Sequence, residues 1–344
     1  MSHAQVALEV RGLRTTLFLR DGPVEVVRGV SFTLREGETL ALVGESGCGK
    51  TLTALSVMRL LPDPPARVTD GQVLLGDADI RALAEGEMRS LRGETVSMVF
   101  QEPLTSLDPV FTVGDQIVEA ITAHRKLSRR EARDMAVEIL REVHIPSPEL
   151  RLRDHPHQLS GGMRQRVMIA MALVLDPRVL IADEPTTALD VTIQAQILDL
   201  IRSEQERRRL AVLLITHNLA VVSQVADRVA VMYAGEVVEE APAEEIFADP
   251  RHPYTQGLLS SIPLASVDSK RLHTIPGRVP DPRLPPPACL FAPRCPYATA
   301  RCWQEHPALL PQNDRLLRCW NPQPFTALQS AEVRETAPMP AVSD

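Results

Sequence analysis

The stretch that decides the fold is Gly44-Glu45-Ser46-Gly47-Cys48-Gly49-Lys50-Thr51. It fits the pattern G-x-x-x-x-G-K-[ST], in which backbone N–H groups surround the phosphates of a nucleotide. Glycine permits the backbone conformations that such a loop needs, and the following helix turns its positive end toward the same phosphates. Lys50 is expected to neutralise phosphate charge, and the Thr51 hydroxyl to bind Mg²⁺. An apolar strand at 39–43 and a helix at 51–60 flank the loop, so the sequence predicts a nucleotide site.

The composition is that of a globular protein with about two domains. The chain has 344 residues, of which 44% are hydrophobic and 24% charged. A net charge of −7 argues against nonspecific binding of nucleic acid. No apolar run approaches the roughly 18–20 residues that span a bilayer, and the N-terminus lacks the apolar core of a signal peptide. We therefore expect a cytosolic protein whose membrane role, if it has one, depends on a separate partner.

Short apolar runs alternate with helical patterns along the chain. Strands that alternate with helices predict a mostly parallel α/β sheet, and such sheets bind ligands beyond the carboxyl ends of their strands. Residues 6–43 instead predict short strands with a glycine turn at Asp21-Gly22-Pro23. Phe18 stands among these strands and is a candidate for stacking on adenine, with a core or surface phenylalanine as the equal alternative. The residues that directly follow apolar runs of the parallel sheet are Gly44, Gln101, Asp183, Glu184 and His217.

Two adjacent carboxylates follow the apolar strand at 179–182. Asp183 has the place of a strand-end carboxylate that binds Mg²⁺ directly or through water. Glu184 can polarise a water for attack on a γ-phosphate. Such a pair on its own is usually surface charge, but the apolar strand and the upstream phosphate loop favour the catalytic interpretation. His217, after another apolar strand, is a candidate hydrogen-bond donor to the γ-phosphate.

A second anion site is predicted at Ser160-Gly161-Gly162, which open a helix within the sequence Leu159–Met163. The site ends a segment, about 102–165, that reads as helical and distinct and includes a capping box at Ser128-Arg-Arg-Glu131. One nucleotide does not need both anion sites of one chain. A head-to-tail dimer resolves this, because each nucleotide then lies between the phosphate loop of one subunit and the Ser-Gly-Gly helix of the other.

Taken together, these motifs resemble the ordered set of ABC-transporter ATPase subunits over about residues 5–250. The motifs are the 44–51 loop, Gln101, Leu159-Ser-Gly-Gly-Met163, Val179–Glu184, Ala188-Leu-Asp190 and His217. The resemblance implies an ABC-type P-loop ATPase fold with an N-terminal antiparallel β subdomain and a helical signature subdomain. It also implies ATP and Mg²⁺ as cofactors, Glu184 as catalytic base, Gln101 as the link from Mg²⁺ to the membrane-domain contact, and Asp190 at the dimer interface.

Met163 stands where glutamine is commoner in the family. This variant, with Ala182–Gln194 and His252–Leu259, is similar to the oligopeptide/dipeptide/nickel importer branch. That branch implies transmembrane permease subunits, a second and related ATPase chain, an indirect solute-binding partner, and a place on the cytoplasmic face of the inner membrane. The alternatives are import of nickel or another solute, and a soluble ABC-type ATPase of DNA repair or translation. The sequence lacks the long coiled coil of the repair type and the second ATPase unit of the translation type.

Four of the five cysteines crowd into a predicted extension at 251–325: Cys289, Cys295, Cys302 and Cys319. Disulfides are disfavoured in a cytosolic ATPase. Zinc through four thiolates is possible, although the usual tight C-x2–4-C pairs are missing. A [4Fe–4S] cluster fits the count and is implied by the resembled branch, and four unliganded thiols are the remaining alternative. Cys48 is expected to be a small packing residue. Residues 326–344 are small, polar and proline-bearing, which predicts a disordered tail.

Overall fold

The computed structural model describes residues 5–101, 106–187, 189–261, 275–283 and 288–325. Its centre is an eight-stranded sheet in which β6, β7, β8, β3 and β9 run parallel, and nearly every residue of these strands is buried. This confirms the predicted α/β class, with antiparallel strands added at one edge. From edge to edge the strands are β11 (Leu310–Gln312), β12 (Arg315–Leu317), β10 (Glu236–Pro242), β9 (Arg228–Tyr233), β3 (Thr39–Val43), β8 (Ala211–Thr216), β7 (Val179–Asp183) and β6 (Val96–Val99).

A second, antiparallel sheet has the order β2-β1-β4-β5 and confirms the N-terminal antiparallel subdomain that the resemblance implies. Its first two strands have 14 residues each and are longer than the short strands predicted over 6–43. β1 (Val6–Leu19) and β2 (Gly22–Arg35) form a long hairpin. β4 (Ala66–Leu75) pairs with β1 and β5 (Ala78–Asp79) with β4, and α2 (Glu85–Leu91) follows. Helix α1 (Lys50–Val57) contacts this sheet, where the hydroxyls of Thr15 and Ser56 make a buried hydrogen bond of 2.7 Å. The antiparallel sheet and the core sheet therefore enclose one apolar cluster.

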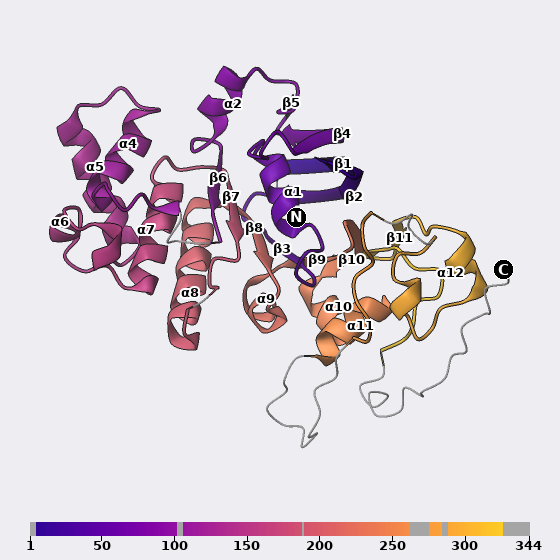
Figure 1. Cartoon of the computed structure of the whole chain (residues 1–344). Coiled ribbons are helices and arrows are strands. Elements are labelled where there is room, and N and C mark those ends of the chain that lie inside the picture. The colour runs from indigo at the N-terminus through magenta and orange to yellow at the C-terminus, as the bar shows by residue number, and fades with distance from the viewer. Residues whose placement is uncertain (1–4, 102–105, 188, 262–274, 284–287, 326–344) are drawn as a thin grey trace.

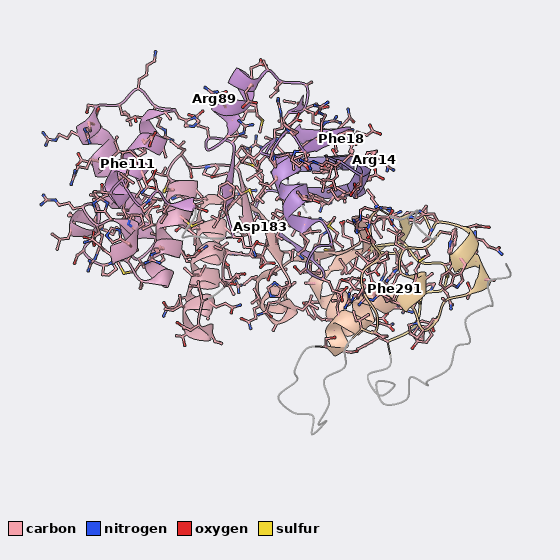
Figure 2. The ribbon with its side chains drawn as sticks, viewed as in Figure 1. Arg14, Phe18, Arg89, Phe111, Asp183 and Phe291 are labelled. Atoms are coloured by element: carbon pink, nitrogen blue, oxygen red, sulfur yellow. The ribbon has the colours of Figure 1, made fainter. Side chains whose placement is uncertain are left out.

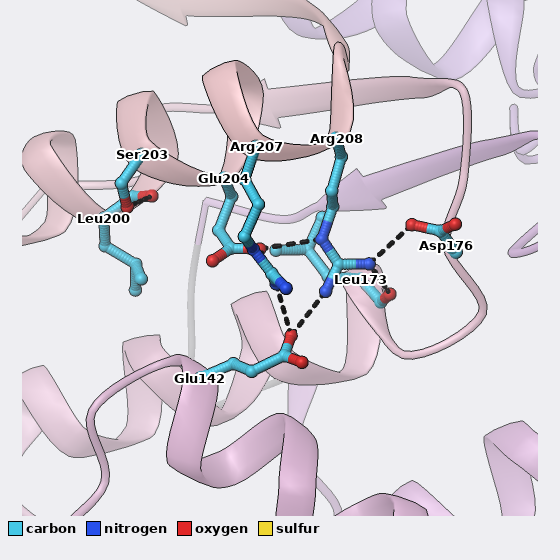
Figure 3. Close-up of polar contacts among 8 residues, drawn as sticks. All are labelled: Glu142, Leu173, Asp176, Leu200, Ser203, Glu204, Arg207 and Arg208. Carbon is cyan, nitrogen blue, oxygen red and sulfur yellow. Dashed lines mark hydrogen bonds and ion pairs between the residues drawn. The ribbon is translucent and has the colours of Figure 1, made fainter.

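The helical segment lies at one end of the molecule (Figure 1). Its capping box is confirmed, because Ser128 N–H donates to Glu131 Oε2 at 2.8 Å. A network of ion pairs ties α5 to α8, with Glu142 Oε2 at 2.5 Å from both Arg207 Nη2 and Arg208 Nη2 (Figure 3). The helices of this segment are α4 (Val113–Thr122), α5 (Arg129–Glu142), α6 (Pro148–Arg151) and η1 (Pro156–Gln158). Helix α7 (Gly161–Leu173) begins at its end, and α8 (Val191–Arg208) follows β7.

The C-terminal extension continues the core sheet, because β12 pairs with β10 and β11 with β12. Figure 1 shows the extension at the end of the molecule opposite the helical segment. The predicted disordered tail at 326–344 lies outside the described residues. Within the described residues, no helix has both the length and the apolarity to cross a membrane. The remaining helices are α9 (Leu219–Val225), α10 (Ala243–Ala248), α11 (Pro253–Ser260), η2 (Ala292–Arg294) and α12 (Ala300–Gln304).

Candidate active site

The 44–51 loop follows β3 as the sequence predicts, and it ends in the first turn of α1, which spans Lys50–Val57 and not the predicted 51–60. Two of its glycines are required by the close approach of neighbouring backbone. Gly44 has φ +155°, and a Cβ there would overlap the carbonyl oxygen of Met232. Gly49 has φ +104°, and its Cβ would lie 2.8 Å from the carbonyl oxygen of Val26 on β2. Ser46 and Gly47, between them, are exposed. The loop is thus held against both sheets while its tip remains accessible.

Lys50 is buried and its ammonium group is aimed back into the loop. Its Nζ donates to the carbonyl oxygens of Gly44 at 2.8 Å and Glu45 at 3.0 Å. Cys48 is also buried and belongs to the apolar cluster between the two sheets, which agrees with its predicted packing role. Burial raises the pKa of the Cys48 thiol, so that the thiol stays protonated beside the lysine. The cation of Lys50 is therefore fixed among the backbone groups that would surround phosphates.

Thr51 and Asp183 come together across 132 positions of sequence. The Thr51 hydroxyl donates to Asp183 Oδ1 at 3.3 Å, and Asp183 lies at the buried end of β7 near the middle of the molecule (Figure 2). Burial raises the pKa of the Asp183 carboxyl to about 6, against the opposing effects of the Thr51 hydrogen bond and the Lys50 charge. One hydroxyl and one carboxylate, with phosphate oxygens, form the kind of oxygen donor set that Mg²⁺ takes.

Glu184 is the centre of a hydrogen-bonded group beyond β7. Its Oε1 lies 3.1 Å from His217 Nδ1, and its Oε2 accepts from Gln101 Nε2 at 3.1 Å. Thr187, which the sequence analysis missed, donates its hydroxyl to Oε2 at 2.8 Å. Burial alone would raise the pKa of Glu184, but the hydrogen bonds from Thr187 and His217 and the nearby positive charge outweigh it and lower the pKa. The side chain is therefore an ionised carboxylate with three partners.

The Ser-Gly-Gly motif begins α7 as predicted. The Ser160 hydroxyl caps the helix by accepting from Met163 N–H at 3.3 Å. Gly162 allows close contact with α8, since a Cβ there would lie 2.7 Å from Cγ2 of Ile193. Asp190 caps α8 by accepting from Ile193 N–H at 2.9 Å, and a Cβ at Gly161 would lie 3.5 Å from Leu189. The structure thus brings Ser160, Gly161, Gly162 and the Asp190 turn together.

Phe18 occupies the tip region of the β1–β2 hairpin and is 50% exposed. The guanidinium carbon of Arg67 lies 5.9 Å from the centre of its ring. Figure 2 shows Phe18 on the antiparallel sheet, away from Asp183 in the core. The ring is therefore available for stacking, but it is not packed against the phosphate loop.

The four C-terminal cysteines gather in one part of the extension as free thiols. Cys289 N–H donates to the Cys302 carbonyl oxygen at 2.9 Å, and Cys295 interacts electrostatically with the other three thiols. Burial raises the pKa of Cys295 and of Cys319 to about 12, so these two thiols are protonated. Across the described residues, no group of three or more His, Cys, Asp or Glu side chains is arranged to hold a metal ion.

Comparisons with known proteins agree with this geometry. A family model described as ABC transporter matches residues 27–187, and one described as Oligopeptide/dipeptide transporter, C-terminal region matches residues 238–302. The chain is 50% identical over 314 residues to the oligopeptide transport ATP-binding protein AppD of Bacillus subtilis, covering 91% of this chain and 96% of AppD. It is 51% identical to the dipeptide transport ATP-binding protein DppD of the same organism, covering 91% and 94%.

Among solved structures, the chain is similar to a dimeric post-hydrolysis state of the ATP-binding cassette MJ0796 bound to ADP and Pi. The TM-score is 0.62 at 27% identity, covering 69% of this chain and 98% of that one. The fold and the site thus define an ABC-type ATPase. The chain belongs to the ABC transporter family, as an ATP-binding protein of its oligopeptide/dipeptide branch.

Proposed function

We propose that this chain hydrolyses ATP to power the import of dipeptides or oligopeptides through a separate transmembrane permease. The observation that carries the proposal is that two adjacent carboxylates at the end of β7 have different partners. Asp183 is hydrogen-bonded to Thr51, and Glu184 is hydrogen-bonded to Gln101 and His217. The peptide as cargo is supported by the similarity to AppD and DppD and by the match of residues 238–302 to the transporter C-terminal region.

In this proposal, the backbone N–H groups of the 44–51 loop and Lys50 bind the triphosphate. Mg²⁺, held by the Thr51 hydroxyl and the Asp183 carboxylate with Gln101 nearby, offsets phosphate charge when bound. Glu184 accepts a proton from the water that attacks the γ-phosphorus, and the products are ADP and inorganic phosphate. His217 orients the Glu184 carboxylate and donates to the γ-phosphate. Phe18 is proposed to stack on adenine.

The Ser160 helix is proposed to act on the nucleotide of a second ATPase subunit. The contacts of Gly161 and Gly162 are with Leu189 and Ile193, and not with the phosphate loop of the same chain. The backbone N–H groups of Gly161 and Gly162, which precede the Met163 N–H that Ser160 caps, would then bind phosphate from another subunit. Asp190 begins the neighbouring helix and would lie at the same interface. The similarity to a dimeric cassette structure supports this arrangement, and the second subunit is proposed to be a related but different chain.

The permease is proposed to dock beside Gln101. Three large apolar side chains lie exposed in this part of the chain, with exposed fractions of 38% for Phe100, 73% for Val110 and 52% for Phe111. Exposed apolar side chains mark interaction surfaces where they form one patch, and the proposal is that these three do so. Movement of the helical segment would then reach the permease. The protein is accordingly proposed to lie on the cytoplasmic face of the membrane, attached through the permease subunits. A solute-binding protein would act indirectly, through the permease.

The four cysteines of the extension are proposed to hold a [4Fe–4S] cluster, with one zinc ion as the alternative. Four thiols in one short segment match the number of donors that such a cluster takes, and metal binding would deprotonate them. As the described side chains lie, they form no metal-holding group, so a cluster would have to draw the thiols together. The test is anaerobic purification with an absorption spectrum and analysis of iron, sulfide and zinc. About four irons and four sulfides per chain would support the cluster, one zinc would replace it with a structural zinc site, and no metal would reject both.

The transport proposal is tested with the full chain reconstituted with candidate peptide-permease subunits and a related second ATPase subunit. We expect ATP hydrolysis to rise when the solute-binding protein is added with a dipeptide or oligopeptide, and not with the binding protein alone. Stimulation of ATP hydrolysis by nickel instead of peptide would identify nickel, and not peptides, as the transported solute. Stimulation by DNA or ribosomes, with no response to the permease, would overturn transport in favour of a repair or translation ATPase.

A further inference from the structure

Glu45, the second residue of the phosphate loop, is held at three points. Its N–H donates to the Tyr254 hydroxyl at 2.9 Å, and its carbonyl oxygen accepts from Lys50 at 3.0 Å. Its carboxylate accepts two hydrogen bonds from Arg294, with Nη1–Oε2 at 2.6 Å and Nη2–Oε1 at 2.9 Å. Tyr254 and Arg294 both belong to the part of the chain after residue 250. The extension therefore contacts the phosphate loop in two ways: the Tyr254 hydroxyl accepts from the Glu45 backbone, and Arg294 forms a bidentate ion pair with the Glu45 carboxylate.

Arg294 is fixed from all sides. Its side chain is 4% exposed, and its guanidinium also donates to the carbonyl oxygens of Pro276 at 2.9 Å and Ile275 at 3.3 Å. The guanidinium lies 5.7 Å from the centre of the Tyr233 ring. A planar guanidinium held by two carbonyls and a ring has one orientation, so that two of its three remaining N–H groups meet the two carboxylate oxygens of Glu45.

An aromatic cluster joins the extension to the core at the same place. Phe291, three residues before Arg294, lies 5.2 Å from the Tyr233 ring and 5.4 Å from the Tyr254 ring, and Figure 2 shows it within the extension. Tyr233 ends β9 and Tyr254 lies in the first turn of α11, and both are fully buried. Aromatic packing thus sets the position of Arg294 relative to the phosphate loop, and it brings the Arg294 guanidinium next to the Glu45 carboxylate.

The ion pair also has an electrostatic consequence for nucleotide binding. Glu45 places a carboxylate inside a loop that surrounds phosphates, and like charges at such short range repel. Arg294 offsets that charge directly, and it is too well buried for water to replace it. Without Arg294, the carboxylate would oppose the triphosphate and would no longer be held to one side of the loop.

We propose that Arg294 is a positioning residue of the ATP site, which fixes the phosphate loop from the extension and offsets the charge of Glu45. ATP affinity then depends on the extension. Because Cys295 follows Arg294 directly, one short segment connects the cysteine cluster to the phosphate loop. The proposal rests only on the ATP-binding part of the function, so that it can fail while peptide transport stands.

The test compares Arg294→Ala, Arg294→Lys, Glu45→Gln and the double variant Arg294→Ala/Glu45→Gln in the full chain. The readout is the Kd for a fluorescent ATP analogue with Mg²⁺, with KM and kcat of hydrolysis measured beside it. We expect Arg294→Ala to raise Kd and KM about tenfold with a smaller change in kcat, and Arg294→Lys to raise Kd less. Adding Glu45→Gln to Arg294→Ala should return Kd to within about threefold of the parent chain, because the opposing charge is gone.

Arg283→Ala is the matched control, since Arg283 pairs with Asp281 on the exposed surface of the same extension, and its Kd should be unchanged. An unchanged Kd in Arg294→Ala would overturn the proposal. So would a raised Kd that Glu45→Gln does not lower, because a purely structural loss is not repaired by removing a charge. Should Arg294→Ala fail to fold, the same comparison is made with Arg294→Lys and Arg294→Lys/Glu45→Gln, and it decides in the same way.

Discussion

Glu184 and His217 face each other beyond the ends of β7 and β8, with Glu184 Oε1 3.1 Å from His217 Nδ1. The backbone of Glu184 has φ +46°, in the left-handed region that residues with a side chain rarely adopt. Gln101 and Thr187 hold its other carboxylate oxygen. Strained backbone that its surroundings maintain is found at functional sites. The geometry fixes the carboxylate at the one position where it meets partners from three different segments.

Replacing Glu184 with Gln should leave ATP binding intact and reduce hydrolysis by about 10²–10⁴-fold. The amide has nearly the same shape and can keep hydrogen bonds, but it cannot accept a proton from the attacking water. The measurement is steady-state phosphate release together with the Kd for ATP. Glu206→Gln is the control, because Glu206 is an exposed carboxylate that pairs with Arg202 on α8. Full hydrolysis by the Glu184 variant would remove this residue as the base.

Replacing Lys50 with Ala should weaken ATP binding by about 10–100-fold, as expected for the loss of a charge-assisted contact to phosphate. The ammonium group is already fixed by the Gly44 and Glu45 carbonyl oxygens, so that it is lost from a preorganised position. Affinity for a fluorescent ATP analogue is the measurement. Lys126→Ala, an exposed lysine of the helical segment, serves as the control. Equal affinity in the two variants would contradict the phosphate-loop assignment.

The strand-end residues could be predicted because parallel strands bring their carboxyl ends to one edge of a sheet. Asp183, Glu184 and His217 each follow a continuous apolar run, and the structure brings them together. Thr187 was missed because its only signal in the sequence is a hydroxyl three residues after Glu184, and such a spacing is common by chance. The ion pair between Glu45 and Arg294 joins residues 249 positions apart, and no pattern in the sequence links them. The pairing of β12 with β10 was also unpredictable, because β12 is three residues long and carries no alternating pattern.

The contribution of His252 to the stability of the chain should fall between pH 7 and pH 5, opposite in sign to that of Asp183, whose raised pKa favours the native state as pH falls. Burial lowers the pKa of His252 to about 3, and the Arg318 charge acts in the same direction. Its Nδ1 accepts from Tyr254 N–H at 3.0 Å, which requires the neutral ring. Below the unfolded pKa of about 6.5, the unfolded chain binds a proton that the native chain does not, so the free energy of unfolding falls as pH falls. At pH 5 this loss is about 2 kcal/mol.

Urea unfolding at the two pH values measures this effect. In His252→Asn the asparagine can still cap α11, but it does not titrate, so the difference between the two pH values should shrink by about 2 kcal/mol. His144→Asn is the control, because His144 is exposed and its φ of +57° suits asparagine. An equal pH dependence in the parent chain and in His252→Asn would rule out His252 as the source.

Gly162→Ala should impair the action of the Ser160 helix without weakening ATP binding by the single chain. A Cβ at Gly162 would lie 2.7 Å from Cγ2 of Ile193, so α7 must shift against α8 at the end that carries Ser160. In a head-to-tail dimer this end meets the nucleotide of the other subunit. We therefore expect an unchanged Kd for ATP in the isolated chain and a loss of hydrolysis of about tenfold or more.

The dimer itself is measured by size-exclusion chromatography with ATP in the Glu184→Gln background, where slow hydrolysis should preserve the closed state. If the chain pairs only with a related subunit, that subunit is added to both samples. Gly86→Ala is the matched control, since Gly86 lies on helix α2 and a Cβ there meets nothing within 4 Å. ATP should shift the control to the dimer and leave Gly162→Ala monomeric. A Gly162→Ala chain that dimerises and hydrolyses like the control would show that the Ser160 helix does not complete the ATP site of a partner.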